Sequence, residues 1–341
     1  MKRTFIAVLT IAAAVACNKS EVIEIAPQNA ISFDAPFIEN ATKAIDPSYT
    51  IETIDAFKVY GTMTNADDKV ANIFNAVEVS KNTDTNVGTN ANGSWGYAEA
   101  STQYWVSGNS YAFAAVAGTN GVTVNTDGNG MPSTITYDAD TQTDLLYAYD
   151  NHGGVAHSST TSATTVAFNF DHLLSKAKFS FTNGYPEGFT VTVTNVAITN
   201  AHAAGTYTIG GTWAPDTTAD PATETVDFGA VVASTAIAVT EAVAIPATEE
   251  TNVYSSNYER LLIPANYTAL AIKYSYYVTS KENLVVKNVT DATATVAVNL
   301  EAGHNYNFTA EIKDQLTPIT FSVNTLTGWD TPAGHDTTVS L

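Results

Sequence analysis

Residues with the chemistry for catalysis are few in this chain and do not form a recognised catalytic pattern. Ser175 and Lys178 match the Ser-x-x-Lys pattern of acyl-transferring serine enzymes, but the companion Ser-Asp-Asn and Lys-Thr-Gly elements are missing. That nucleophile also needs a helix start, whereas the residues after Lys176 alternate as in a strand. The chain has no Gly-x-Ser-x-Gly elbow and no phosphate-binding glycine loop. We therefore expect a protein without enzymatic activity.

Candidate metal ligands are equally dispersed. None of the six histidines forms a His-x-His or His-x-x-x-His pair, so no short motif brings two imidazoles to one ion. Asp138, Asp140 and Asp144 resemble part of a calcium-binding loop but lack its glycine and terminal glutamate. His152 and His157 lie in a glycine-containing loop, where a metal site is an alternative to a solvated loop. We expect solvated turns at both places and no bound metal or cofactor.

The elements that must position any site belong to a long, acidic and sparsely charged chain. It has 341 residues, 34 acidic against 14 basic, for a net charge of −20. Such a charge argues against nucleic acid and against the surface of anionic membranes as partners. A hydrophobic share of 45% supplies ample material for a buried core. The single cysteine excludes an intramolecular disulfide framework.

The first 16 residues read as a secretory signal peptide. Lys2 and Arg3 precede an apolar run, residues 5–16, that is too short to span a bilayer. The only cysteine, Cys17, follows small residues, which resembles a bacterial lipobox with Ala14 where leucine is usual. We predict a lipoprotein acylated at Cys17. An ordinary signal peptide with an incidental cysteine is the alternative.

Short alternating runs rich in Thr, Val, Tyr and Phe predict an all-β body. Typical runs are residues 166–170, 178–182, 190–194, 272–276, 293–298 and 319–323, and Gly, Asn, Asp and Pro separate them. An alternation with period two buries one face of each strand, as in a β-sandwich. The only plausible helical pieces are residues 145–149 and 172–175. We place a domain boundary near residue 172, with β-sandwiches over 44–172 and 173–341.

Aromatic residues gather in two places and allow two interpretations. They are Trp95, Tyr97, Tyr104 and Trp105 in the first group and Tyr274, Tyr276 and Tyr277 in the second. Exposed, they would form a carbohydrate-binding platform, and the chain would be a surface glycan-binding lipoprotein. In alternating strands, however, such residues more often pack in the core. We favour the core interpretation.

Several stretches together resemble the fimbrillin family of Bacteroidetes, the subunits and accessory lipoproteins of type V pili. Residues 166–181, VAFNFDHLLSKAKFSF, are similar to the family's F-x-H-x-hydrophobic-S-K-x-x-F signature. Further similar stretches are residues 54–61, 261–264, 300–308 and 319–323, the last followed by Gly-Trp-Asp at 328–330. Each piece is degenerate by itself. Their order and spacing, over nearly the whole chain, make the resemblance fairly specific.

The resemblance implies two transthyretin-like β-sandwich domains and export as an outer-membrane, cell-surface lipoprotein. It implies that a surface protease cuts after a basic residue in the leader, residues 17–43, and removes a strand. A terminal strand of the next subunit then fills the apolar groove, and the fimbria that forms contributes to adhesion to a host or bacterial surface ligand. The implied partners are therefore other pilus subunits, the protease, such a ligand, and the membrane through lipid on Cys17 before cleavage.

On this chain the resemblance points to particular residues in the leader. Ile31 and Phe33 would share one face of the removable strand, and Lys43 is the candidate cleavage residue, with Ala44 as the new start. An ordinary linker lysine is the alternative. The family's familiar protease is arginine-specific, but the only arginines here are Arg3 and Arg260. Either the protease accepts lysine, or the lipidated leader stays attached, as would suit an anchor subunit.

The donor strand is expected in the C-terminal region. Ile319, Phe321 and Val323 share a face, and the tail can place Val339 and Leu341 together. The tail is either a donor segment or an edge strand of its own domain. Stalk, tip and anchor roles stay open at this point.

Overall fold

The computed structural model describes residues 30–38, 54–81, 86–87, 95–152, 165–216, 223–233, 242–247, 254–313 and 319–326. In these ranges the regular structure is β-strand apart from two single-turn 3-10 helices, η4 (Glu99–Ser101) and η5 (Ala139–Thr141). The predicted all-β class is thus confirmed. None of the described helices is long and apolar enough to cross a membrane.

The prediction of short helices was wrong at both places. Residues 146–152 form strand β9, and residues 172–175 comprise the end of β10, a two-residue connection and the start of β11. Leu, Tyr and Ala at 145–149 tolerate either conformation, but β9 pairs along its length with β6. Pairing with distant strands therefore overrides the local preference.

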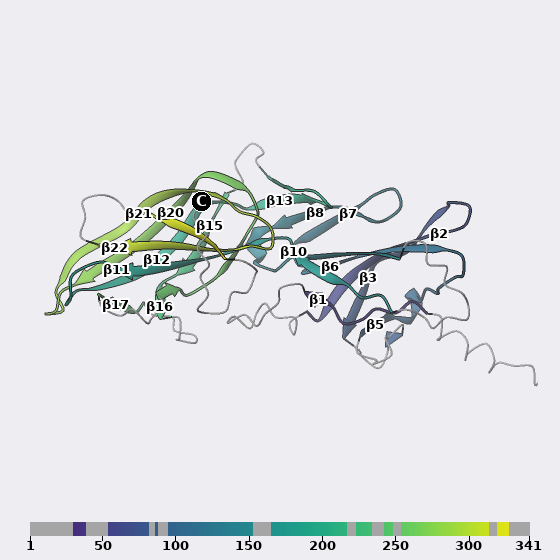
Figure 1. The fold of residues 1–341 in the computed structure, drawn as a ribbon, viewed down its shortest axis with the longest axis horizontal. Coiled ribbons are helices and arrows are strands. Elements are labelled where there is room, and N and C mark those ends of the chain that lie inside the picture. Colours follow the sequence, from purple (N-terminus) through teal and green to yellow (C-terminus); the bar gives the residue numbers. More distant parts are fainter. Residues whose placement is uncertain are drawn as a thin grey trace, which may run out of the picture.

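The N-terminal half is built on one eight-stranded sheet with the order β1-β10-β9-β6-β2-β3-β5-β4. The bounds are β1 (Phe37–Ile38), β2 (Ala56–Thr64), β3 (Val70–Lys81), β4 (Asn86–Val87), β5 (Trp95–Ala98), β6 (Ser110–Ala117), β9 (Leu146–His152) and β10 (Asn169–His172). One face of this sheet carries an aromatic-rich core. Figure 1 places these strands together at one end of the molecule.

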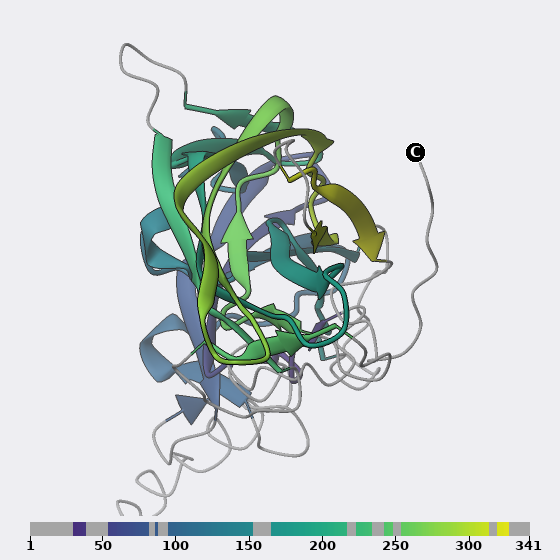
Figure 2. The ribbon, with the colours of Figure 1, turned by 90° about the vertical axis from the view of Figure 1, so that its left-hand side faces the viewer.

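Two sheets enclose the core of the C-terminal half, and Figure 2 shows them facing each other. One contains β11 (Ser175–Asn183), β16 (Val231–Ala233), β18 (Tyr254–Ser256), β19 (Arg260–Leu262), β22 (Asn305–Ile312) and β23 (Ser322–Leu326). The other contains β12 (Thr190–His202), β15 (Thr223–Gly229), β17 (Ala244–Pro246), β20 (Asn266–Thr279) and β21 (Val285–Asn299). Val191 and Val193 on β12, and Phe179 and Phe181 on β11, point into this core. The predicted alternation is confirmed here.

A fourth sheet crosses the proposed boundary at residue 172. It joins β7 (Val122–Thr126) and β8 (Pro132–Asp138) to β13 (Ala204–Thr208) and β14 (Trp213–Pro215). A third apolar cluster, which includes Tyr137, Leu173 and Leu261, lies beneath it. The two halves are therefore connected by a shared sheet and a shared core. The division into two domains stays a prediction.

Candidate functional site: the leader strand in the N-terminal core

The leader residues that share a predicted face lie in the core of the N-terminal half. The side chains of Ile31 and Phe33 are fully buried, while Asp34 and Ala35 are turned toward solvent. Full burial of a phenylalanine side chain contributes about 2–3 kcal/mol by the hydrophobic effect alone. Residues 31–33 are therefore an integral part of this core.

Phe33 sits inside a cage of four aromatic rings. Its ring centroid lies 5.4 Å from that of Phe74, 5.7 Å from Tyr97, 6.0 Å from Phe113 and 5.9 Å from Phe168. Three of these pairs are edge-to-face and the fourth is stacked, both of which are favourable ring geometries. The cage draws on β3, β5, β6 and the segment before β10, so the leader strand joins elements that are far apart in sequence.

One edge of the leader strand is fastened to the segment after η4. The amide of Ile31 donates to the carbonyl of Gln103 at 2.8 Å, and Ala30 forms an antiparallel bridge with Tyr104. The Tyr97 hydroxyl donates to the Ile31 carbonyl at 2.6 Å. Burial raises the pKa of Tyr97 to about 12, so the hydroxyl keeps its proton and stays a donor at neutral pH.

The other edge is fastened to residues 165–168. The amide of Val166 donates to the Ser32 carbonyl at 2.8 Å, and the amide of Asp34 donates to the Val166 carbonyl at 2.9 Å. Further along, the amide of Phe37 donates to the Phe168 carbonyl at 3.0 Å. The leader is thus paired on both edges, as a central strand is. Removing it would leave an apolar groove bordered by unpaired backbone groups.

Glycine is required beside this cage. A Cβ at Gly61 of β2 would lie 2.9 Å from an atom of Phe113 and 3.0 Å from an atom of Phe74. Only glycine lets the strand approach these rings so closely. Gly61 was not among the predicted site residues, and neither were Phe74, Tyr97 and Phe113 as walls of a groove.

The serine that matched a catalytic pattern has a structural role, and so has the lysine that follows it, whereas Lys178, the lysine of the pattern, is partly exposed on β11. Ser175 is fully buried at the start of β11, and its hydroxyl donates to the carbonyl of Glu301 at 3.0 Å. The Lys176 ammonium, whose side chain is 3% exposed, lies 3.2 Å from a Glu259 carboxylate oxygen. Both side chains connect β11 to other segments of the C-terminal half.

The candidate calcium-loop carboxylates do not converge on one point. Asp138 caps η5 by accepting a hydrogen bond from the amide of Asp140 at 3.0 Å. Asp144 instead pairs with His172, with 2.7 Å between Oδ2 and Nδ1. Across the part of the chain that the structure describes, no group of three His, Cys, Asp or Glu residues could hold a metal ion. The side chains of the two histidines in the glycine-containing loop lie outside the described part.

Most of the aromatic residues that might have formed a carbohydrate platform are in the cores. The exposed fractions are 5% for Trp95, 0% for Tyr97, 7% for Trp105, 3% for Tyr274 and 4% for Tyr276. Tyr104, at 44%, is the exposed member of the first group. The favoured core interpretation is confirmed for the five buried residues, whereas Tyr104 and the partly exposed Tyr277 do not belong to the cores.

The first candidate donor segment occupies the core of its own half. Ile319 and Phe321 are 6% and 5% exposed, and the Phe321 ring lies 5.7 Å from both Phe179 and Tyr274. Val323 lies on β23, opposite Phe308 of β22, at the edge of the sheet. In this structure the segment is therefore an edge strand of its own half. Outside the described residues lie Cys17, Lys43, Ala44, Val339 and Leu341.

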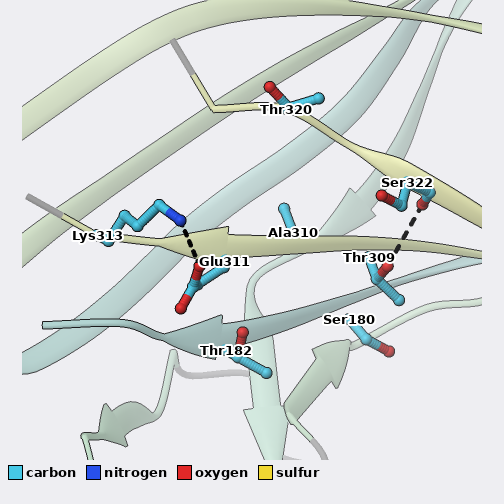
Figure 3. A pocket seen from close by; sticks show the side chains of 8 residues that line it. All are labelled: Ser180, Thr182, Thr309, Ala310, Glu311, Lys313, Thr320 and Ser322. Atoms are coloured by element: carbon cyan, nitrogen blue, oxygen red, sulfur yellow. Dashed lines mark hydrogen bonds and ion pairs between the residues drawn. The ribbon is translucent and has the colours of Figure 1, made fainter. Parts of the chain in front are cut away.

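A polar hollow of about 440 Å³ lies where β22 and the segment before β23 diverge (Figure 3). Its lining residues are Ser180, Thr182, Thr309, Ala310, Glu311, Lys313, Thr320 and Ser322. Glu311 and Lys313 form an ion pair of 2.7 Å at its border. It lacks the apolar and aromatic lining of typical ligand pockets, and it was not predicted from the sequence.

Comparison with known proteins relates the chain to fimbrial proteins by a family model and by fold. A family model described as fimbrillin-like matches residues 42–329. The crystal structure of a fimbrial protein from Bacteroides vulgatus is similar, with a TM-score of 0.62 and 18% identity, over 89% of this chain and 100% of that chain. At this identity the likeness shows a common fold. No curated protein matches in sequence.

Two other structural matches have TM-scores below 0.5. A putative cell adhesion protein from Bacteroides uniformis has a TM-score of 0.42 and 20% identity, over 89% of this chain and 100% of that chain. The fimbrial anchor protein Mfa2 from Porphyromonas gingivalis has a TM-score of 0.34 and 12% identity, over 88% of this chain and 96% of that chain.

Proposed function

The chain belongs to the fimbrillin-like family, and from this premise we propose that it is a structural, non-enzymatic subunit of a bacterial surface pilus that assembles by strand exchange. Its fold is that of a Bacteroides fimbrial protein. In the proposed role the chain joins other pilus subunits at the cell surface and contributes to adhesion. The leader strand keeps the N-terminal core closed until a protease removes it.

The observation that carries this proposal is the position of the leader strand. Phe33 is fully buried among four rings, and the strand is paired on both edges. Loss of the leader would expose those rings and leave the carbonyl of Gln103 and both backbone groups of Val166 without partners. A groove of this kind strongly favours any extended segment that restores the hydrogen bonds and fills the core.

The proposed cleavage follows Lys43, in the connection between β1 and β2. A cut there would separate the leader strand from the chain that begins at Ala44. An enzyme that cuts only after arginine could not release this leader, because the arginines are Arg3 and Arg260. A retained leader, lipidated at Cys17, would instead make the chain an anchor subunit in the outer membrane.

The proposed donor comes from the C-terminal region of another subunit. The sequence Ile319-Thr-Phe321 repeats the spacing of Ile31-Ser-Phe33, with an aliphatic side chain followed two residues later by a phenylalanine. Each pair packs into its own core in the uncleaved chain. A segment with this spacing can place its two apolar side chains on one face of the groove. The tail with Val339 and Leu341 is the alternative donor.

Limited proteolysis tests the proposal. Purified residues 18–341 would be treated with a lysine-cutting protease and followed by mass spectrometry and by a denaturing gel of unboiled samples. We expect one early cut after Lys43 and then a ladder of stable multimers. Lys43→Ala should abolish both. Lys69→Ala, which removes an exposed lysine between β2 and β3, is the matched control and should change neither.

The other outcomes discriminate between roles. A clean cut without multimers would contradict self-assembly and indicate a tip or accessory subunit. Resistance at Lys43 would contradict cleavage at this position and favour the anchor role.

A further inference from the structure

We propose that residues 165–170, here called the latch, keep their ordered backbone position only while a segment fills the leader site. From Asp171 onward the chain keeps its position without that segment. The latch would then be the movable wall of the groove. This inference rests on the proposed function only in taking the leader to be removable.

The latch takes its backbone pairing from the leader. Val166 exchanges hydrogen bonds of 2.8 and 2.9 Å with Ser32 and Asp34, and the Phe168 carbonyl accepts from Phe37 at 3.0 Å. Asn169 and Phe170 pair in parallel with β1, which is also part of the leader. On the other side, pairing of β10 with β9 begins only at Asp171. Loss of the leader would therefore remove the backbone hydrogen bonds that pair residues 166–170 with it.

The side chains of the latch would keep only part of their packing. Val166, Phe168 and Phe170 are at most 1% exposed. The Phe168 ring stacks on Phe33 at 5.9 Å, and that contact is lost with the leader. Phe57 on β2 remains, with its ring centroid 5.8 Å from Phe168 and 5.6 Å from Phe170. The latch would stay attached to the sheet by these rings while its backbone opens.

A clamp follows the latch immediately. His172 pairs with Leu146 of β9 and forms the 2.7 Å contact with Asp144. The Leu173 amide donates to the Leu145 carbonyl at 2.9 Å, and the Trp213 indole donates to the Leu173 carbonyl at 2.6 Å. None of these contacts involves the leader. Loosening of the latch should therefore stop here and leave β11 unaffected.

The latch also constrains the segment that replaces the leader. Phe33 and Val166 form a parallel bridge, so the replacement must run parallel to the latch while it donates to, and accepts from, the backbone of Val166. Because the latch can move away from the groove, such a segment can enter from the side and need not slide in from one end. The matching partner is an extended segment with an aliphatic residue and, two positions on, an aromatic one.

Hydrogen–deuterium exchange of the full chain tests the latch. Asp34→Pro removes the donor to Val166. The matched control is Ala35→Pro, because among the described residues the Ala35 amide donates to the side chain of its own neighbour Asp34 and not to the latch. We expect amides 166–170 to exchange several-fold faster in Asp34→Pro and unchanged in Ala35→Pro. Amides 172–183 should be unchanged in both.

The cleaved chain provides a second measurement that does not depend on the proline variant. After the leader is cut and released, exchange at 166–170 should rise about a hundredfold, since the hydrogen bonds of Val166 and Phe168 to the leader and the pairing of residues 169–170 with β1 are lost together. A synthetic peptide of residues 28–38 should restore the slow exchange. Two results would overturn the proposal about the latch. One is unchanged exchange at 166–170, and the other is faster exchange that extends into β11 or through all of β6. If exchange at 166–170 rises after cleavage but the chain never forms multimers, strand exchange is contradicted and the proposal about residues 165–170 still holds.

Discussion

Replacing Phe33 with alanine tests most directly whether the leader is part of the core. The side chain is fully buried and its ring lies 5.4–6.0 Å from four other rings. Truncation of a buried phenylalanine to alanine costs about 3–5 kcal/mol, because the transfer free energy and the cost of the cavity add. The strand is held on both edges by backbone hydrogen bonds, so the cavity cannot collapse easily. We therefore expect a loss of about 4 kcal/mol in the free energy of unfolding of the N-terminal half.

The assay is urea unfolding of the uncleaved chain, followed by tryptophan fluorescence. Trp95 and Trp105 belong to the same core as Phe33 and report on its opening. Phe37→Ala is the matched control, because this phenylalanine lies in the same leader but is 57% exposed. It should change stability by less than about 0.5 kcal/mol. Equal effects of the two substitutions, or a loss below about 1 kcal/mol for Phe33→Ala, would refute the reasoning.

Three further predictions concern the junction between the halves. Gln142→Ala removes hydrogen bonds of 3.0 and 2.9 Å to the Leu261 carbonyl and amide and should cost about 2 kcal/mol in urea unfolding; no measurable loss would contradict this role. Asp144→Ala removes the carboxylate that contacts His172 at 2.7 Å and should cost about 1–3 kcal/mol, and a double-mutant cycle with His172→Gln should show strong non-additivity. Burial, and then a hydrogen bond with a neighbouring aspartate, raises the pKa of Glu224 from 4.5 to about 8. The free energy of unfolding that this group contributes should therefore be fully present below pH 4.5 and be lost as the pH rises through 8. Glu224→Gln should lack this loss, and a melting temperature of the variant that still fell over the same interval would contradict the assignment.

The sequence alone was sufficient to predict the all-β class, the faces of many strands and the family. Alternation with period two is a local property, so it placed Ile31 with Phe33, and Phe179 with Phe181, on common faces without any knowledge of the partners. The signature at residues 166–181 combined with other stretches to indicate the family. The same local reasoning failed at residues 145–149, where the composition suits a helix and pairing with β6 makes a strand.

Which elements lie beside one another was decided only in the tertiary structure. The leader contacts Tyr97 and Thr165, which are 66 and 133 residues away from their partners in sequence. No local pattern encodes such a distance, because backbone amides and carbonyls are the same at every position. The aromatic cage around Phe33 depends on several strands meeting there, and so does the sheet that links the two halves. Residue type and alternation determine which side chains seek burial, whereas the choice of partners follows from packing all of them at once.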